Sequence, residues 1–146
     1  HICGCNYLVE KYHSKIICSV LCSEAIQDAK RNHSLFYNQK AFQVPAADIC
    51  IEDIGFNWNW NGWGITFFVA EGHTNAGICF EIGNSLFTGD TLLKDLRTVT
   101  KLFCGSKEKL VVTINRIKRL QGKGFYVYPG HGDGFDLDNY DLNKAL

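Results

Sequence analysis

The chain has 146 residues, of which 46% are hydrophobic and 21% are charged. This composition is typical of one compact globular domain with a core, here residues 1–146, and it excludes a disordered or fibrous chain. Fifteen lysines and arginines balance fifteen aspartates and glutamates, so no global electrostatic field favours nucleic acid or an anionic membrane as a partner.

Segment patterns and cysteine usage predict a cytoplasmic location. No apolar run approaches the roughly 18 residues that a membrane helix needs, and the first residues do not have the basic and then apolar pattern of a signal peptide. The seven cysteines are an odd number scattered through expected strands and helices, which favours reduced thiols. Because the sequence opens on His1 and contains no methionine, we expect further residues upstream.

Short helices and strands are predicted first, followed by two hairpins. A helix is expected over residues 2–12, a buried strand over 15–20, and a helix from a cap at Ser23 to about Asn32. Each hairpin has a favoured two-residue turn. The first joins residues 47–60 to 63–70 through Asn61-Gly62, and the second joins 78–82 to 85–88 through Gly83-Asn84.

A longer amphipathic helix is predicted near the end of the chain. Ser106 is a good N-cap, and apolar residues then recur at the three-and-four spacing of one buried face as far as about Gln121. Gly122 and Gly124 are expected to end this helix. Residues 125–128 are predicted to form a strand that leads directly into Pro-Gly-His-Gly.

Three polar residues follow apolar strands, each beside glycine: His73, Asp90 and His131. Glycine lets the backbone turn sharply and approach a bound group closely. A carboxylate and two imidazoles at neighbouring strand ends would suit zinc or another borderline metal ion. Any one of them alone is more often a turn residue or a cap, so the hypothesis depends on the set of three.

The stretches EGHTNAGICFEIGNSLFTGDTLL and, much later, YPGHG closely resemble the metallo-β-lactamase superfamily, particularly its small hydrolases similar to hydroxyacylglutathione hydrolase (glyoxalase II). The resemblance also covers HICGCNYLVEKY, which looks like the continuation of the family's His-x-His-x-Asp-His motif, with His1 as its last histidine. It implies an α/β fold of the αββα sandwich type whose N-terminal portion, by family analogy roughly 50 to 70 residues, precedes His1.

The same resemblance implies a binuclear metal centre, with two Zn²⁺ ions expected and Fe or Mn as alternatives. His73 would bind the first ion, Asp90 would bridge both and act as the catalytic carboxylate, and His1 and His131 would bind the second. A metal-bound hydroxide would then cleave a thioester, ester or lactone of a small-molecule substrate. Two alternatives are an iron-dependent relative that handles sulfur or oxygen, and a non-catalytic scaffold that has lost its upstream ligands.

Two departures from the family pattern bear on these expectations. Glu71 stands where many members have proline, and a common Gly-Arg pair is absent after the Gly-Asp-Thr segment, which leaves the substrate class open. Asp133 is a candidate to orient His131.

Cysteine and tryptophan clusters each allow two interpretations. The spacing of Cys3, Cys5, Cys18 and Cys22 does not match common zinc knuckles, so small buried hydrophobes are favoured over a second zinc site. Trp58, Trp60 and Trp63 favour core and hairpin packing over an apolar wall beside the metals.

Overall fold

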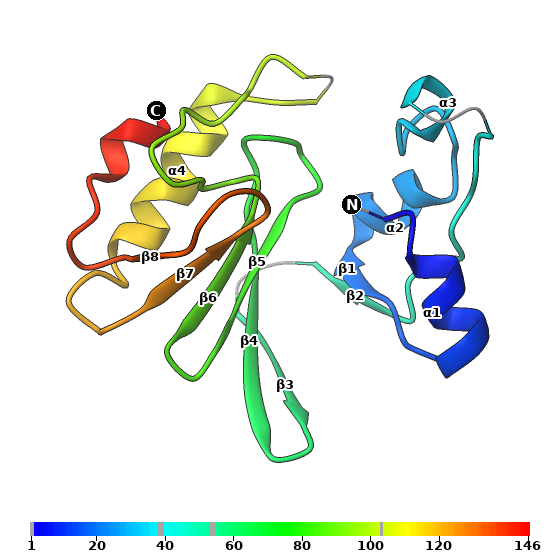
Figure 1. Cartoon of the computed structure of the whole chain (residues 1–146), viewed down its shortest axis with the longest axis horizontal. Helices are drawn as coiled ribbons and strands as arrows, with labels where there is room; N and C mark the ends of the chain where they lie inside the picture. The colour runs from blue at the N-terminus through cyan, green and yellow to red at the C-terminus, as the bar shows by residue number, and fades with distance from the viewer. Residues whose placement is uncertain (1, 38–39, 53–54, 103) are drawn as a thin grey trace. The chain divides into compact units, whose positions relative to one another are not determined.

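The computed structural model describes residues 2–37, 40–52, 55–102 and 104–146. The chain divides into two compact units, His1–Glu52 and Asp53–Leu146, which are described separately below and can be followed by colour in Figure 1. The assignment of residues 1–146 to a single domain stays a prediction. Across the described residues, no helix has both the length and the apolar character needed to cross a bilayer.

The first unit combines short helices with two parallel strands. Its elements are α1 (Cys5–Tyr12), β1 (Ile17–Ser19), α2 (Val20–Ile26), α3 (Ser34–Tyr37) and β2 (Ile49–Ile51). Strands β1 and β2 pair in parallel, with Ile17 beside Ile49. The prediction of a cap at Ser23 is wrong, because the helix begins one turn earlier. The Ser19 hydroxyl accepts the Cys22 N–H at 3.1 Å, whereas Ser23 is buried and accepts the Ala47 N–H at 2.9 Å.

The second unit is one sheet with a helix packed on it. Six strands in the described part of this unit pair in the order β3-β4-β5-β6-β7-β8, and only β6 and β7 are parallel neighbours. The elements are β3 (Phe56–Trp60), β4 (Trp63–Val69), β5 (Ile78–Ile82), β6 (Ser85–Gly89), α4 (Lys107–Lys118), β7 (Tyr126–Pro129), β8 (Phe135–Asp136) and the 3₁₀ helix η1 (Leu142–Ala145).

Both predicted hairpin turns are confirmed. Asn61 and Gly62 both have positive φ, at 50° and 87°, as a two-residue turn between twisted strands requires, and Trp60 pairs with Trp63. In the second hairpin Ile82 pairs with Ser85. The continuous strand expected over residues 47–60 is instead two strands in different sheets, β2 and β3; residues 53 and 54 lie outside the described residues.

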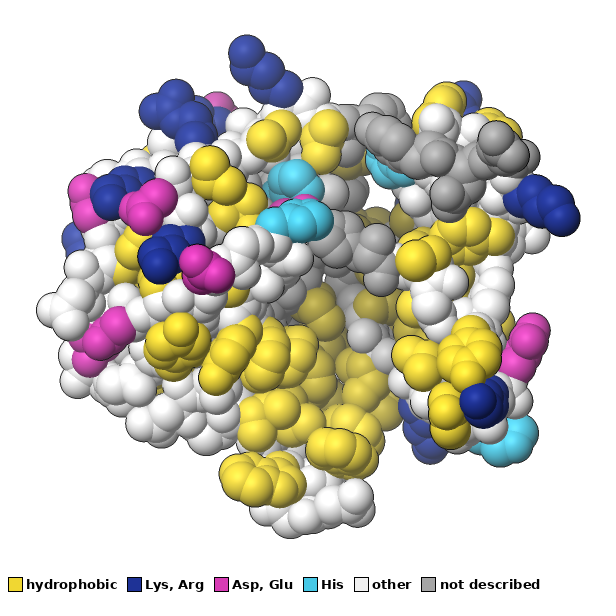
Figure 2. All heavy atoms as spheres, viewed as in Figure 1, with side chains coloured by type: hydrophobic (Ala, Val, Ile, Leu, Met, Phe, Trp, Pro, Cys, Tyr) yellow, Lys and Arg dark blue, Asp and Glu magenta, His cyan; other side chains and the backbone are white. Residues whose placement is uncertain are grey.

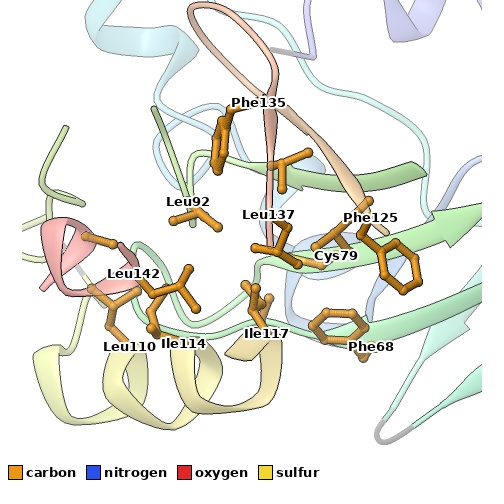
Figure 3. Close-up of a cluster of buried hydrophobic side chains, with 14 residues drawn as sticks. Phe68, Cys79, Leu92, Leu110, Ile114, Ile117, Phe125, Phe135, Leu137 and Leu142 are labelled. Atoms are coloured by element: carbon orange, nitrogen blue, oxygen red, sulfur yellow. The ribbon is translucent and has the colours of Figure 1, made fainter. Parts of the chain in front are cut away.

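Helix α4 forms as predicted, because the Ser106 hydroxyl accepts the Lys109 N–H at its start. Its apolar face, Leu110, Ile114 and Ile117, points toward Phe68 of the sheet and toward Leu137 and Leu142 of the C-terminal segment (Figure 3). Trp60 and Trp63 lie outside this core, since they are 53% and 61% exposed, although Phe68 of the same hairpin belongs to it. The packed helix gives the neighbouring loops a fixed support.

Candidate metal centre

His73 lies in a tight loop after β4 that is held against the first turn of α4. Gly72 has φ of 143°, and a Cβ there would approach the Leu110 Cα to 2.6 Å, so only glycine fits between loop and helix. The Gly72 carbonyl accepts the Ser106 N–H at 2.9 Å, and its N–H donates to the Thr74 carbonyl. The backbone on either side of His73 is therefore fixed.

Glu71, which departs from the family pattern, adds two further links to α4. Its carboxylate lies 2.6 Å from the Lys109 ammonium, and its backbone carbonyl accepts the Thr113 hydroxyl at 2.7 Å. Thr113 is buried, so this second bond is shielded from water, whereas the exposed Lys109 pair contributes little. The buried bond uses the backbone carbonyl, which any residue at position 71 would supply, so the exposed pair with Lys109 is the contribution specific to glutamate.

Asp90 and His131 come from the ends of the two parallel strands, β6 and β7. Parallel strands place their carboxyl ends at the same edge of a sheet, and the Gly130 N–H donates to the Gly89 carbonyl at 2.9 Å across this edge. A Cβ on Gly130 would collide with Asp90 Oδ1 and would lie 3.2 Å from the Asp90 N. The glycine before His131 therefore makes room for the Asp90 carboxylate.

The three predicted side chains meet at one carboxylate oxygen. Asp90 Oδ2 lies 3.7 Å from His73 Nε2 and 3.6 Å from His131 Nε2. The side chains of His73 and Asp90 are 23% and 19% exposed, and that of His131 is 63% exposed, so the site opens to solvent on the His131 side. Two histidines beside an acidic side chain are visible at this surface in Figure 2.

The orientation of His73 is fixed by a backbone carbonyl. Its Nδ1 lies 2.8 Å from the Val99 carbonyl oxygen, and because a carbonyl only accepts, Nδ1 must carry the proton. With the proton on Nδ1, the neutral form of the ring would direct the lone pair of Nε2 at Asp90 Oδ2. No sequence pattern pointed to Val99, because any residue type supplies a carbonyl and 26 positions separate the partners.

Two acceptors that face each other in this way suit a cation. The 3.6 and 3.7 Å separations exceed ordinary N–H···O hydrogen-bond lengths of about 2.7 to 3.2 Å. They are within reach of two ligands that each lie about 2.0 to 2.2 Å from one zinc ion. An acceptor on the second ring nitrogen is also the usual arrangement of a metal-binding histidine. Each of the two histidine–Asp90 pairs therefore has ligand atoms and a separation that suit a metal ion.

The described residues do not form a complete set of ligands for a metal ion. Over residues 2–37, 40–52, 55–102 and 104–146, no group of three or more His, Cys, Asp or Glu side chains is arranged to hold a metal ion as it stands. The two histidines each approach one oxygen of Asp90 as a pair, without a third ligand from these residues closing the site. His1, the fourth predicted ligand, lies outside the described residues. Asp133 is exposed, and its role toward His131 stays a prediction.

The cysteines of the first unit form a thiol cluster. All seven cysteines of the chain, each within the described residues, are free thiols. Cys18 is buried in the middle of β1, pairs in register with Cys50 of β2, and shares a hydrogen bond with the Cys22 thiol. This bond lowers the pKa of Cys22 to about 7, while the pKa of Cys18 is raised. Of the four cysteines interpreted as buried hydrophobes only Cys18 is buried, because Cys3 is exposed and Cys5 and Cys22 are partly buried.

No protein-family model matches the chain. Among curated proteins, the chain is 36% identical over 66 residues to the probable polyketide biosynthesis zinc-dependent hydrolase PksB of Bacillus subtilis, a match that covers 45% of this chain and 29% of PksB. It is 34% identical over 86 residues to the probable polyketide biosynthesis zinc-dependent hydrolase BaeB of Bacillus velezensis, covering 59% of this chain and 38% of BaeB. The matched part of the chain thus spans about a third of the length of these relatives.

Solved structures match nearly the whole chain. The B3 metallo-β-lactamase BLEG-1 has a TM-score of 0.83 at 17% identity and covers 94% of this chain and 66% of its own. TTHA1623, solved in a di-iron-bound form, has a TM-score of 0.74 at 20% identity over 94% of this chain and 67% of its own. ETHE1 from Myxococcus xanthus has a TM-score of 0.68 at 18% identity over 99% and 60%.

These similarities define the class of fold. The chain has the α/β fold of the metallo-β-lactamase superfamily, as the resemblance of its short motifs implied. His73, Asp90 and His131 meet within its second unit.

The space beside Gly130 gives a direct test of the site. A Gly130→Ala variant should displace the Asp90 carboxylate, because the added methyl group would occupy the position of Oδ1. We expect its affinity for zinc to fall by about tenfold or more, because changing a residue that holds a metal ligand in place usually lowers affinity by that much. Competition with a chromophoric chelator measures this affinity. Gly64→Ala is the matched control, since a Cβ there meets nothing within 4 Å. Equal affinities in the two variants would contradict this geometry.

The thiol cluster predicts a pH-dependent reactivity. Because the thiolate is the nucleophile, alkylation of Cys22 by iodoacetamide should rise as the pH passes about 7. Cys79 should stay unmodified in the folded protein, since burial raises its pKa to about 12. Removing the hydrogen-bonding thiol with Cys18→Ala should move the Cys22 midpoint upward, toward the ordinary value of about 8.5, and Cys50→Ala should not. Peptide mass spectrometry across pH measures both, and an unmoved midpoint in Cys18→Ala would refute the assignment.

Proposed function

We propose that this protein is a metal-dependent hydrolase whose centre is built on His73, Asp90 and His131. One observation carries the proposal: a single oxygen of Asp90 faces the Nε2 atoms of both histidines at 3.7 and 3.6 Å, while the Val99 carbonyl holds His73 in the tautomer that leaves Nε2 free to bind a metal. Both curated relatives are named as zinc-dependent hydrolases, which supports this class of activity.

Zinc is the metal that we propose, in a binuclear centre. His73 would hold the first ion, Asp90 would bridge the two, and His131 would hold the second. When bound, the two ions would supply an activated water and a positive field for the oxyanion that develops on the attacked group. Iron is the alternative that a neighbour solved in a di-iron-bound form supports, and manganese is a further candidate.

The chain's own residues would orient and expose this centre. Asp90 would act as the catalytic carboxylate, kept in place by the close approach of Gly130. The half-buried His73 is fixed by its carbonyl partner, whereas the exposed His131 marks the side open to solvent. We infer that a small-molecule substrate enters from that side.

The proposed substrates are thioesters, esters or lactones, in the manner of the hydrolases that resemble glyoxalase II. All of them contain an acyl carbon that an activated water can attack, with an oxyanion developing in the transition state. We also propose a reducing, cytoplasmic setting, supported by seven free thiols, and no nucleic-acid or membrane partner, supported by the balance of fifteen basic and fifteen acidic residues. Oligomeric state is not part of the proposal.

Metal analysis together with a hydrolysis panel tests the proposal. The purified protein should bind about two zinc ions per chain and hydrolyse at least one thioester, ester or lactone, and a strong chelator should abolish the activity. Asp90→Asn should lower activity by more than about 100-fold, because losing even a residue that supports a ligand typically costs about 10- to 100-fold. Asp28→Asn is the matched control, because this exposed carboxylate of the first unit accepts the backbone N–H groups of Lys30 and Arg31, and it should leave zinc content unchanged.

The same data separate the alternatives. If the purified protein retains iron and consumes oxygen in the presence of a thiol substrate, the result supports the iron-dependent alternative and contradicts the zinc hydrolase. Protein that binds no metal and hydrolyses nothing in the panel would contradict both enzymes and favour the non-catalytic scaffold.

A further inference from the structure

Thr98 is a buried residue in the loop that runs from the end of β6 to α4, and it makes two hydrogen bonds. Its side chain is almost completely inaccessible, at 3% exposure of the residue. The hydroxyl donates to the Thr91 carbonyl at 2.9 Å, and the backbone N–H donates to the Ala145 carbonyl of η1 at 3.0 Å. Thr98 thus ties the loop both to the strand end behind it and to the C-terminal segment.

The two bonds of Thr98 connect segments that lie next to the proposed ligands. Thr91 directly follows Asp90, and Val99, whose carbonyl orients His73, directly follows Thr98. One threonine side chain therefore links the segment that carries the carboxylate to the segment that fixes the imidazole. The Thr91 N–H also donates to the Thr88 carbonyl at 3.1 Å, so the strand end itself is held.

Other attachments of the loop lie before Leu96. Leu92 is fully buried and its carbonyl accepts the Thr88 hydroxyl at 2.9 Å, and the Asp95 carboxylate lies 2.6 Å from the Lys144 ammonium. Residues 94–97 are exposed, and Val99 is 53% exposed, so packing alone does not fix the Val99 carbonyl. One further anchor comes from Tyr140, whose hydroxyl accepts the Asp95 N–H at 2.8 Å and donates to the Leu93 carbonyl at 3.1 Å. A segment with so little buried apolar surface is locally weak unless such bonds hold it.

We propose that Thr98 is a positioning residue for the His73–Asp90 pair, which it serves by tying the Val99 carbonyl to the strand end that bears Asp90. The inference rests on the proposed function, in that it concerns the same metal centre. It goes further because Thr98 contacts neither metal nor substrate and still determines how His73 and Asp90 are placed relative to each other. A hydroxyl is required here because valine, with the same shape, cannot donate to the Thr91 carbonyl.

Three variants of the full chain test the proposal. Thr98→Val removes the hydroxyl with little change in volume, and Thr98→Ser restores it. Ser34→Ala is the matched control, because Ser34 is also buried and its hydroxyl also bonds a backbone segment, at Phe42 in the first unit. Tyr140→Phe is a second way of loosening the same loop if Thr98→Val does not fold.

Two readouts separate positioning from general stability. The first is zinc affinity, measured by competition with a chromophoric chelator. The second is the His73 Nδ1–H signal in ¹⁵N NMR spectra of metal-free protein at about pH 8, where an ordinary imidazole is neutral; the signal is assigned by its loss in His73→Gln. The thermal midpoint of each variant is recorded alongside.

We expect Thr98→Val to lower zinc affinity by about 10- to 100-fold and to broaden or shift the His73 signal. Thr98→Ser should recover both, and Ser34→Ala should lower the thermal midpoint without changing either. The proposal is overturned if Thr98→Val keeps its affinity and its His73 signal, if serine does not rescue, or if Ser34→Ala has the same effect on zinc. Wild-type protein that binds no zinc would refute the proposed function, and the metal-free NMR comparison would still decide whether Thr98 positions His73.

Discussion

The hydrogen bond from His73 Nδ1 to the Val99 carbonyl is the interaction on which the site depends. It selects the tautomer of the ring, and with it the lone pair that Nε2 directs at Asp90 Oδ2, 3.7 Å away. Without it the imidazole could rotate or donate to the carboxylate itself, and the pair would satisfy each other. With it, two acceptors stay face to face, an arrangement that a cation stabilises. The Val99 carbonyl thus holds His73 in an orientation that suits a bound cation.

Close packing around small residues supplies the rest of the geometry. Gly72 lies against the backbone of α4, and Gly130 lies against Asp90, in places where a Cβ would collide. The parallel pairing of β6 with β7 brings residues about 40 positions apart to one sheet edge. Helix α4, with its buried face on the sheet, supports the loop that carries His73 through Ser106 and Thr113. The core and the site are therefore built from the same elements.

Local signals in the sequence predicted local structure well. Asn61-Gly62 specified a turn because few other pairs accept two positive φ angles, and Ser106 specified the start of α4 because its hydroxyl bonds three residues ahead. Ser23 misled because a serine also stabilises tertiary contacts, here with Ala47. The glycine-flanked His73, Asp90 and His131 could be selected as a set, whereas Val99 and Thr98 could not. A carbonyl has no side-chain signature, and a buried threonine resembles any core residue until its partners are known.

The most direct test of this account is X-ray absorption spectroscopy of the zinc-loaded protein at the zinc edge. The free thiols of the first unit are the obvious competitors for a borderline metal ion. Zinc bound by His73, Asp90 and His131 should show a shell of nitrogen and oxygen ligands at about 2.0 to 2.2 Å with the multiple-scattering pattern of imidazole. A sulfur shell at about 2.3 Å would show that cysteines bind the ion, and would contradict a centre built on His73, Asp90 and His131.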